Sequence, residues 1–203
     1  MRKIAMLLAI PFLGIPGAEP ARVPDLSESW EIDPVHSTIQ FRIRHMMLTW
    51  VRGTFDRFSG WVRLDEEDIT RSGGEITIDA RSINTRVPER DADLRSPNFF
   101  DVERYPEIVF RSKRVEEAGK GELKVVGDLT MHGVTKEVTL ELDGPSPPVT
   151  DIHRNVRRGG EARTKIHRKD FGLTWNQTLE SGGLVLDDEV ELTLDLEILQ
   201  RKG

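Results

Sequence analysis

The sequence contains no cysteine among its 203 residues. Disulfides, thiolate metal sites, a cysteine nucleophile and lipoprotein acylation are therefore excluded. It also lacks the GxSxG, P-loop and GxGxxG patterns of nucleophile elbows, phosphate loops and dinucleotide sites. Its five histidines show neither HxH nor HExxH spacing, so the sequence predicts no metal and no cofactor.

Basic residues are too few for a nucleic-acid-binding surface. The chain has 29 Lys and Arg against 35 Asp and Glu, a net charge of −6, and no run of basic residues offsets this balance. Apolar residues at 37% and charged residues at 32% are typical of a soluble protein with a substantial core. A chain of this length is most simply one domain, and no nucleic-acid partner is expected.

The first 21 residues, MRKIAMLLAIPFLGIPGAEPA, have the layout of a secretory signal peptide. Two basic residues precede an apolar run over 4–15, and small residues follow it. The run is too short to span a bilayer, and its two prolines oppose the alternative of a buried N-terminal helix. We predict a signal peptide over 1–21, a linker over 22–29 and one domain over 30–203. The mature chain is then expected to be periplasmic or secreted, with no transmembrane segment.

Apolar and polar residues alternate from residue 30 onward. In STIQFRIRH, residues 37–45, Ile39, Phe41 and Ile43 share one face and polar side chains share the other, as in a half-buried strand. Turn signals rich in glycine separate similar segments. The pattern predicts eight strands, over 37–45, 51–64, 73–81, 108–115, 123–131, 134–142, 161–168 and 189–199.

Such clean alternation predicts an antiparallel sheet with one apolar face. The sequence has no long amphipathic helix to cover that face, so closure of the sheet into an all-β, eight-stranded antiparallel barrel is the simplest solution. A barrel of eight strands either fills its interior with side chains or holds one small apolar ligand. Because several predicted strands are long, we expect a deep interior with room for a guest.

The connection between the third and fourth predicted strands is much longer than a hairpin needs. It contains ERDADLRSPNFFD, residues 89–101, in which we expect a short helix that ends at Pro97. The adjacent Phe99 and Phe100 either both turn toward the barrel mouth or pack separately into the core. The sequence leaves these two arrangements open.

Five segments in order carry a resemblance to a known family. They are WEIDPVHSTIQFRIRH, GTFDRFSG, INTRVPERDADLRSPNFFDVERYPEIVF, VVGDLTMHGVTKEVTLEL and IHRKDFGL. The chain resembles the YceI-like family from Trp30 to about Leu199. That resemblance implies an extended, lipocalin-like barrel in the periplasm or outside the cell. It further implies that the barrel binds, and transports or stores, a polyisoprenoid or similar long lipid such as an isoprenoid quinone, without catalysis.

The sequence departs from the family pattern at two places. Asp93 stands where members usually carry a histidine, so the headgroup contact of that histidine is not expected here. The region DIHRNVRRGGEARTKIHR, residues 151–168, lacks the aromatic residue often found after the glycine turn there, so the loop 151–161 is altered. One end of the barrel is therefore not predicted by the resemblance.

Two groups of residues are candidates for contact with the lipid. The apolar group lies in or beside the strands and is expected to line the cavity, although plain core packing is the alternative for each member. It comprises Phe41, Ile43, Phe55, Phe58, Phe99, Phe100, Phe110, Phe171, Leu173 and Trp175. The polar group is expected at the headgroup or lid and comprises His45, Asn84, Thr85, Arg90 and Asp91.

Arg90 has two interpretations. It either pairs with Asp91 to fix the loop or meets an oxygen of a pyrophosphate or quinone headgroup. Gly53, Gly60 and two further glycines, Gly127 and Gly133, are interpreted as bends or close strand approaches without a binding role.

The sequence is also compatible with two rival functions. An enzyme acting on an apolar or prenyl substrate would use His36 or His45 with a nearby carboxylate. Regular strand geometry puts these histidines on opposite faces, so a shared metal site would need a distant ligand such as His132. We interpret Asp33 as a turn residue at strand entry, with Ser37 bonding locally. The other rival is a filled barrel that acts through its surface, and a homodimer is left open.

Overall fold

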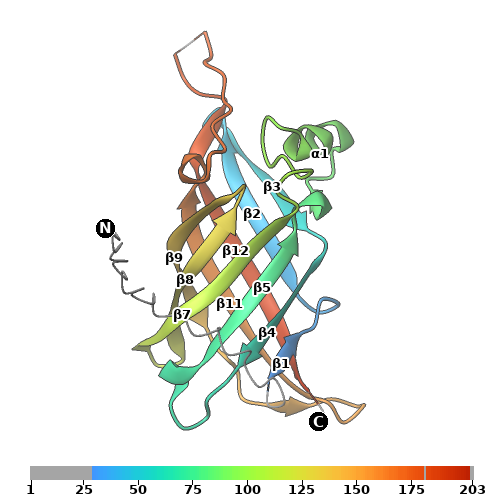
Figure 1. Cartoon of the computed structure of the whole chain (residues 1–203), viewed down its shortest axis with the longest axis vertical. Helices are drawn as coiled ribbons and strands as arrows, with labels where there is room; N and C mark the ends of the chain where they lie inside the picture. Colours follow the sequence, from blue (N-terminus) through green and yellow to red (C-terminus); the bar gives the residue numbers. More distant parts are fainter. Residues whose placement is uncertain (1–28, 181, 202–203) are drawn as a thin grey trace, which may run out of the picture.

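The computed structural model describes residues 29–180 and 182–201, so the predicted signal peptide and nearly all of the predicted linker lie outside the described residues (Figure 1). The strands are β1 (Trp30–Ile32), β2 (Thr38–His45), β3 (Thr49–Phe55), β4 (Phe58–Arg63), β5 (Gly73–Asp79), β6 (Ile83–Asn84), β7 (Glu107–Gly119), β8 (Glu122–Met131), β9 (Val134–Asp143), β10 (Val149–Thr150), β11 (Val156–His167) and β12 (Leu186–Gln200). The helices are α1 (Pro88–Arg95) and the short 3₁₀ helices η2 (Ile69–Arg71), η3 (Ala80–Ser82) and η4 (Arg168–Phe171).

The strands close into an antiparallel barrel (Figure 1). β12 pairs with β11 on one side and with β2 and β1 on the other, and from β11 the pairing runs through β9, β8, β7 and β5 to β4. β1 and β2 form one interrupted wall strand, as do β3 and β4, so the closed ring has eight members. The predicted eight-stranded barrel is confirmed.

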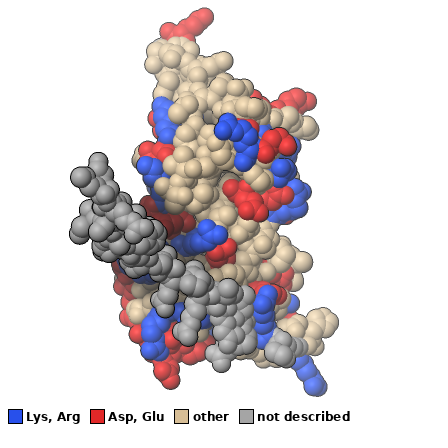
Figure 2. Space-filling view, viewed as in Figure 1, with Lys and Arg blue, Asp and Glu red and all other residues tan. Residues whose placement is uncertain are grey.

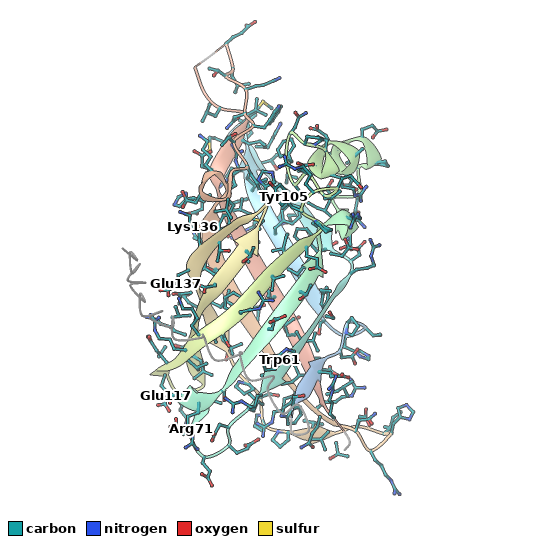
Figure 3. All side chains as sticks on the ribbon, viewed as in Figure 1. Trp61, Arg71, Tyr105, Glu117, Lys136 and Glu137 are labelled. Carbon is teal, nitrogen blue, oxygen red and sulfur yellow. The ribbon has the colours of Figure 1, made fainter. Side chains whose placement is uncertain are left out.

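Alternation along each strand separates the interior from the surface. On β2, Ile39 and Ile43 are buried, whereas Arg42 faces outward and its Nε donates to Glu191 on β12 at 2.6 Å. Figure 3 shows Lys136 and Glu137 on β9, and Glu137 lies 3.0 Å from the outward-facing Lys113 ammonium. Exposed pairs like these contribute about 0–1 kcal/mol each. Burial of the inward side chains is the main source of stability.

The two ends of the barrel differ, and they are called upper and lower as drawn in Figure 1. The upper end carries α1 and the loops 46–48, 96–106 and 172–185. Helix α1 begins at Pro88, where the missing N–H has no helical partner to lose, and ends before Pro97. The predicted helix in the long connection is therefore present. Among the described residues, none of the helices is long and apolar enough to span a membrane.

Candidate functional site

An apolar cavity of about 470 Å³ occupies the upper part of the barrel. This volume lies in the range of small-molecule sites. The inward positions of the alternating strands supply its wall, which explains why the wall is apolar. The strand residues of the wall include Ile39, Phe41, Ile43, Val51, Phe55, Ile76, Ile78, Ile108, Phe110, Leu129, Met131, Val138, Leu140, Ile166, Val190, Leu192 and Leu194.

The adjacent Phe99 and Phe100 both contribute to this wall, but they contact different segments of the chain. Phe100 packs edge-on against Phe55 of β3, with ring centroids 5.9 Å apart. Phe99 packs against Trp175 in the loop after η4, with centroids 5.1 Å apart. The two rings thus join the long connection to both neighbouring parts of the rim, and their side chains still face the cavity.

Phe41 continues this aromatic contact on the neighbouring strand β2. Its ring lies 5.7 Å from that of Phe55 and directly over Gly53 on the neighbouring strand. A Cβ added at Gly53 would lie 2.4 Å from Phe41 Cζ, so only glycine leaves room for the ring in this position. The expected role of Gly53 as a point of close approach agrees with this geometry.

The polar residues of the long connection are arranged around Thr85. Asp91 is buried, and its Oδ1 accepts from the Thr85 backbone N–H at 2.8 Å and from the Thr85 hydroxyl. Arg90 Nε donates to the Thr85 hydroxyl at 2.7 Å. The direct Arg90–Asp91 pair that was one expectation is therefore replaced by a shared partner. This network fixes the loop and leaves Arg90 and Asp93 at the mouth among the lining residues.

Asn84 and Thr85, which were expected at the headgroup or lid, are not among the residues that line the cavity. Asn84 Nδ2 donates to Asp56 at 2.8 Å, because β6 pairs with β3 and directs this side chain to the outer surface. Thr85 is buried and is occupied by the network just described. Of the five polar candidates, His45 and Arg90 line the cavity. Asp91 does not line it, but it accepts hydrogen bonds from Thr85 in the network that holds the loop.

Eight of the ten apolar candidates line the cavity, and Phe58 and Phe171 do not. Phe171 is only 2% exposed and lies in the core at η4, where its carbonyl oxygen is 3.1 Å from His132 Nδ1. Phe58 packs against the core from the first position of β4. Both side chains are thus used in packing, which was the alternative for each of them.

Arg168 is a buried, charged lining residue that the sequence did not mark as a candidate. It is 3% exposed, and its guanidinium donates to the carbonyl oxygens of Leu173 (2.6 Å), Trp175 (2.7 Å) and Asp187 (2.8 Å). Burial lowers the pKa of Arg168, and the nearby Asp188 carboxylate opposes this shift. The residue is the last of a predicted strand, where an exposed arginine is equally common, so no sequence signal marks it. Its contacts hold the loop that covers one side of the mouth.

A second, smaller cavity of about 130 Å³ lies toward the lower end. It shares Ile76, Phe110 and Leu140 with the upper cavity, so these three side chains separate the two spaces. Trp61 lines this second cavity, and Figure 3 shows it in the lower part of the barrel.

The histidines do not form a common site. His45 ends β2 at the upper mouth, whereas His36 precedes β2 near the lower end. Nine residues of extended chain separate them by roughly 30 Å. His132 lies in the turn between β8 and β9 and packs edge-on against Tyr105 at 4.8 Å. A metal site shared by these histidines is therefore excluded by the geometry of the described residues.

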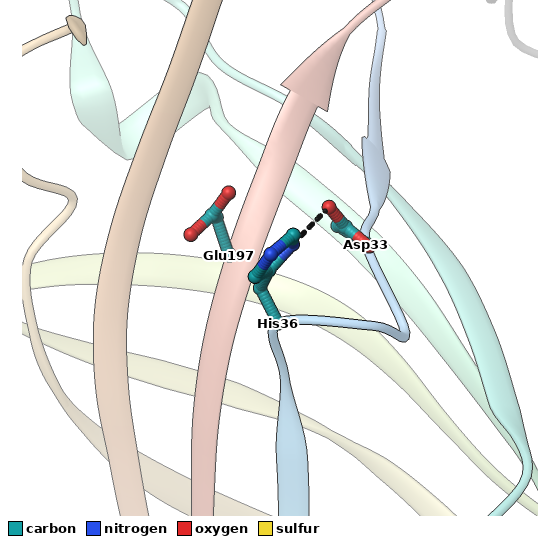
Figure 4. Close-up of side chains that lie close together, drawn as sticks. All are labelled: Asp33, His36 and Glu197. Carbon is teal, nitrogen blue, oxygen red and sulfur yellow. Dashed lines mark hydrogen bonds and ion pairs between the residues drawn. The ribbon is translucent and has the colours of Figure 1, made fainter. Parts of the chain in front are cut away.

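One group in the described part of the chain has spacing that would suit a metal ion: Asp33, His36 and Glu197, with ligand atoms within 4.8 Å of one another (Figure 4). The Arg157 guanidinium already lies between the two carboxylates, donating to Asp33 Oδ2 at 2.7 Å and to Glu197. Burial opposes ionisation of Asp33, but hydrogen bonds from His36 and Arg157 outweigh it and lower the pKa of Asp33 to about 2. The group is an ion-pair network that ties β11, β12 and the entry to β2 together.

Ser37 belongs to the same region and corrects one expectation. It accepts a hydrogen bond from the Glu197 backbone N–H at 2.8 Å, and its hydroxyl donates to the Glu197 carbonyl. The predicted local bond is replaced by a contact with the neighbouring strand β12, because the pairing of β1 and β2 with β12 places this turn beside Glu197.

Comparisons with known proteins agree with this architecture. Residues 30–198 match the model of the YceI-like domain. The chain is 38% identical over 181 residues to a UPF0312 protein of Serratia proteamaculans, covering 87% of this chain and 89% of that protein. It is 38% identical over 169 residues to Protein YceI of Salmonella newport, covering 82% and 83% of the two chains.

Solved structures show the same fold. The Campylobacter jejuni YceI protein superposes with a TM-score of 0.67 at 25% identity, covering 79% of this chain and 91% of that chain. Burkholderia cenocepacia BcnA gives a TM-score of 0.70 at 21% identity over 82% and 98% of the two chains. A polyisoprenoid binding domain from Saccharophagus degradans gives 0.64 at 16% identity over 86% and 99%.

Proposed function

Because this chain belongs to the YceI-like family, we propose that it binds a polyisoprenoid or a similarly long apolar lipid inside its barrel. The observation that carries this proposal is the cavity of about 470 Å³, whose strand-borne wall is almost entirely apolar and whose charged lining residues lie at the mouth. The polyisoprenoid-binding domain of Saccharophagus degradans, which has the same fold, supports the ligand class.

Burial of the chain supplies the affinity. Each CH₂ group moved out of water contributes about 0.8 kcal/mol, so several prenyl units bind tightly with few polar contacts. At the mouth lie Asp93 and Arg90, whose guanidinium is held in place by the Thr85 hydroxyl and carbonyl, and this is where a polar headgroup such as a phosphate or a quinone oxygen would lie. The wall sets affinity, and the mouth sets headgroup preference.

Carriage or storage of the lipid is the use that this arrangement serves, with the periplasm or the extracellular space as the proposed location. A long prenyl chain is poorly soluble in water, and a closed apolar cavity shields it. We propose no catalytic step, since His45 is the histidine that lines the cavity among the described residues and no carboxylate is hydrogen-bonded to it there.

The test is native mass spectrometry of the gently purified mature protein, followed by organic extraction of what it releases. A stoichiometric prenyl lipid or quinone supports the proposal. Val138→Trp, which places an indole in the cavity, should abolish or shorten the bound lipid. Thr139→Trp on the outer face of the same strand is the matched control. A protein that carries no lipid and ignores added prenyl lipids would overturn the proposal.

A further inference from the structure

The turn that joins β2 and β3 exposes apolar side chains at the upper end. Met47 is 66% exposed and Leu48 is 78% exposed. The turn is closed by a hydrogen bond from the Leu48 N–H to the His45 carbonyl at 3.0 Å. We call residues 42–52, which include this turn, the mouth hairpin.

The backbone of this turn is unusual for the residues it carries. Met46 has φ of 50° and Met47 has φ of 59°, so both central residues are left-handed. Hairpin turns of this kind ordinarily carry Asn or Gly, because a bulky side chain is strained at positive φ. Two methionines at these positions therefore lower the stability of the turn. Burial does not offset this cost at Met47, whose side chain is exposed. Such strain points to a function at the tip.

The outer face of the mouth hairpin is cationic and aromatic. Arg44 is paired across the strands with Trp50, and its guanidinium lies 4.3 Å from the centre of the Trp50 ring. Arg42 lies opposite Arg52 on the same face. Among residues 29–180 and 182–201, neither Arg44 nor Arg52 has a carboxylate within ion-pair distance. Between Pro34 and Phe55 the sequence contains no acidic residue, although the whole chain has a net charge of −6.

The inner face of the same hairpin belongs to the cavity. His45, Thr49 and Val51 are among the lining residues. The Met46 N–H donates to the Val185 carbonyl at 2.7 Å, and Val185 also lines the cavity. The exposed apolar tip is thus continuous with the apolar mouth. In Figure 2 the upper end of the visible face is mostly uncharged, with acidic side chains at its topmost tip and side chains of both charges to one side.

We propose that the mouth hairpin docks the barrel on the surface of an anionic lipid bilayer. Met47 and Leu48 insert among the acyl chains, Trp50 lies at the headgroup level, and Arg44 and Arg52 contact lipid phosphates. Apolar tips flanked by aromatic and basic residues bind anionic interfaces in this way. The cavity mouth then faces the membrane, and a long apolar chain passes between bilayer and barrel without crossing water. The docking surface does not depend on the identity of the cargo.

Exposed apolar residues at the lower end do not offer the same surface. Ile152 is 93% exposed and Val149 is 62% exposed. They flank Asp151, and the adjoining network contains Asp33 and Glu197. Arg157 lies within that network, and Arg154 and Arg158 belong to the same segment, so the lower end carries both signs of charge. Because it lies away from the mouth of the larger cavity, it serves as the internal control.

The experiment is co-sedimentation of the mature protein with vesicles, made either of phosphatidylcholine alone or of phosphatidylcholine and phosphatidylglycerol in equal parts. We expect binding to the anionic vesicles that weakens as salt is raised. The double variant Met46→Asn/Met47→Gly fits the turn better and should raise thermal stability, yet weaken vesicle binding about tenfold. Adding Leu48→Ser should weaken it further.

The control variant Val149→Ser/Ile152→Ser should bind vesicles like the parent. Equal loss in this control, unchanged binding of the turn variants, or no preference for anionic vesicles would overturn the proposal. A second copy of the chain could cover the hairpin instead of a membrane, and light scattering of the same variants tests this. If the variants change oligomeric state and not vesicle binding, the hairpin is a contact between two copies. Retention of extracted lipid by the turn variants separates this result from the proposed cargo function.

Discussion

Phe110 on β7 lies directly over Gly127 on β8, where an added Cβ would come within 2.6 Å of Phe110 Cζ. The missing side chain at Gly127 leaves room for the ring to sit at the boundary of the upper and lower cavities. Together with Ile76 and Leu140, the ring limits how deep a guest can reach. The close contact of Phe110 with Gly127 therefore sets the depth of the upper cavity.

Substitution of Phe110 should lengthen the accepted lipid. Phe110→Leu removes the ring, joins the cavities of about 470 and 130 Å³, and should shift the bound prenyl chains toward longer members. Phe110→Ala should do the same at a cost of about 3–5 kcal/mol in stability. Mass spectrometry after incubation with polyprenols of mixed length measures the shift. An unchanged length distribution in both variants would show that depth is set elsewhere.

A methyl group at Gly127 should destabilise the barrel. The added Cβ would lie 2.3 Å from the Arg111 carbonyl oxygen as well as against the Phe110 ring. Gly127→Ala should therefore lower the free energy of unfolding by about 1–3 kcal/mol. Gly159→Ala is the matched control, because its nearest neighbour would be 3.5 Å away. Urea unfolding of both variants compares them directly.

Loss of the Arg168 guanidinium should loosen the loop over the mouth. Arg168→Met leaves the carbonyl oxygens of Leu173 and Trp175 without these donors, which should cost at least about 2 kcal/mol. We also expect faster release of bound lipid. Arg163→Met, on the exposed side of β11, should change stability by less than about 0.5 kcal/mol. Equal lipid release from the two variants would contradict this role.

The acid sensitivity of the barrel should depend on Asp33. Its pKa falls from 3.8 to about 2 on folding, so ionised Asp33 stabilises the fold above pH 3.8, and this contribution is lost as the pH falls through about 2. Asp33→Asn should be less stable at neutral pH by at most about 2 kcal/mol, and the difference should vanish toward pH 2. Urea unfolding at neutral and acid pH measures it. The exposed Asp195→Asn should show a smaller difference.

Replacement of both His36 and His45 by Gln should leave lipid binding intact. His36 lies near the lower end, and His45 is the one of the two that lines the cavity. Lipid stoichiometry and the chemical identity of the extracted lipid are the measurements. If the wild type converts an added prenyl substrate and the double variant does not, the protein is an enzyme and the binding proposal is incomplete.

The strands could be predicted because alternation is a local property of the sequence. Ile39, Phe41 and Ile43 share the inward face of β2 as their spacing predicts. Phe99 and Phe100 could not be placed in the same way, since their irregular loop has no fixed period and their orientation depends on Phe55 and Trp175.

Contacts between segments far apart in the chain could not be predicted from the sequence either. Arg168 is buried because the chain after η4 turns its carbonyl oxygens toward the guanidinium, and nothing in the adjacent residues indicates this. Ser37 bonds to Glu197 through the closure of the barrel, 160 residues away along the chain. Local patterns therefore predicted the barrel wall. The positions of side chains at the mouth, and where β12 meets β2, depend on tertiary contacts that those patterns do not contain.

β12 occupies a special position in the order of folding. It pairs along most of its length with β11 and also joins β2 and β1, which come from the other end of the domain. Contacts so far apart in sequence form late and slowly. Until β12 docks, the inward side chains have no closed interior, so the partly folded chain presents its apolar wall to any lipid or chaperone nearby. The interior therefore becomes closed only when β12 pairs with both β11 and β2.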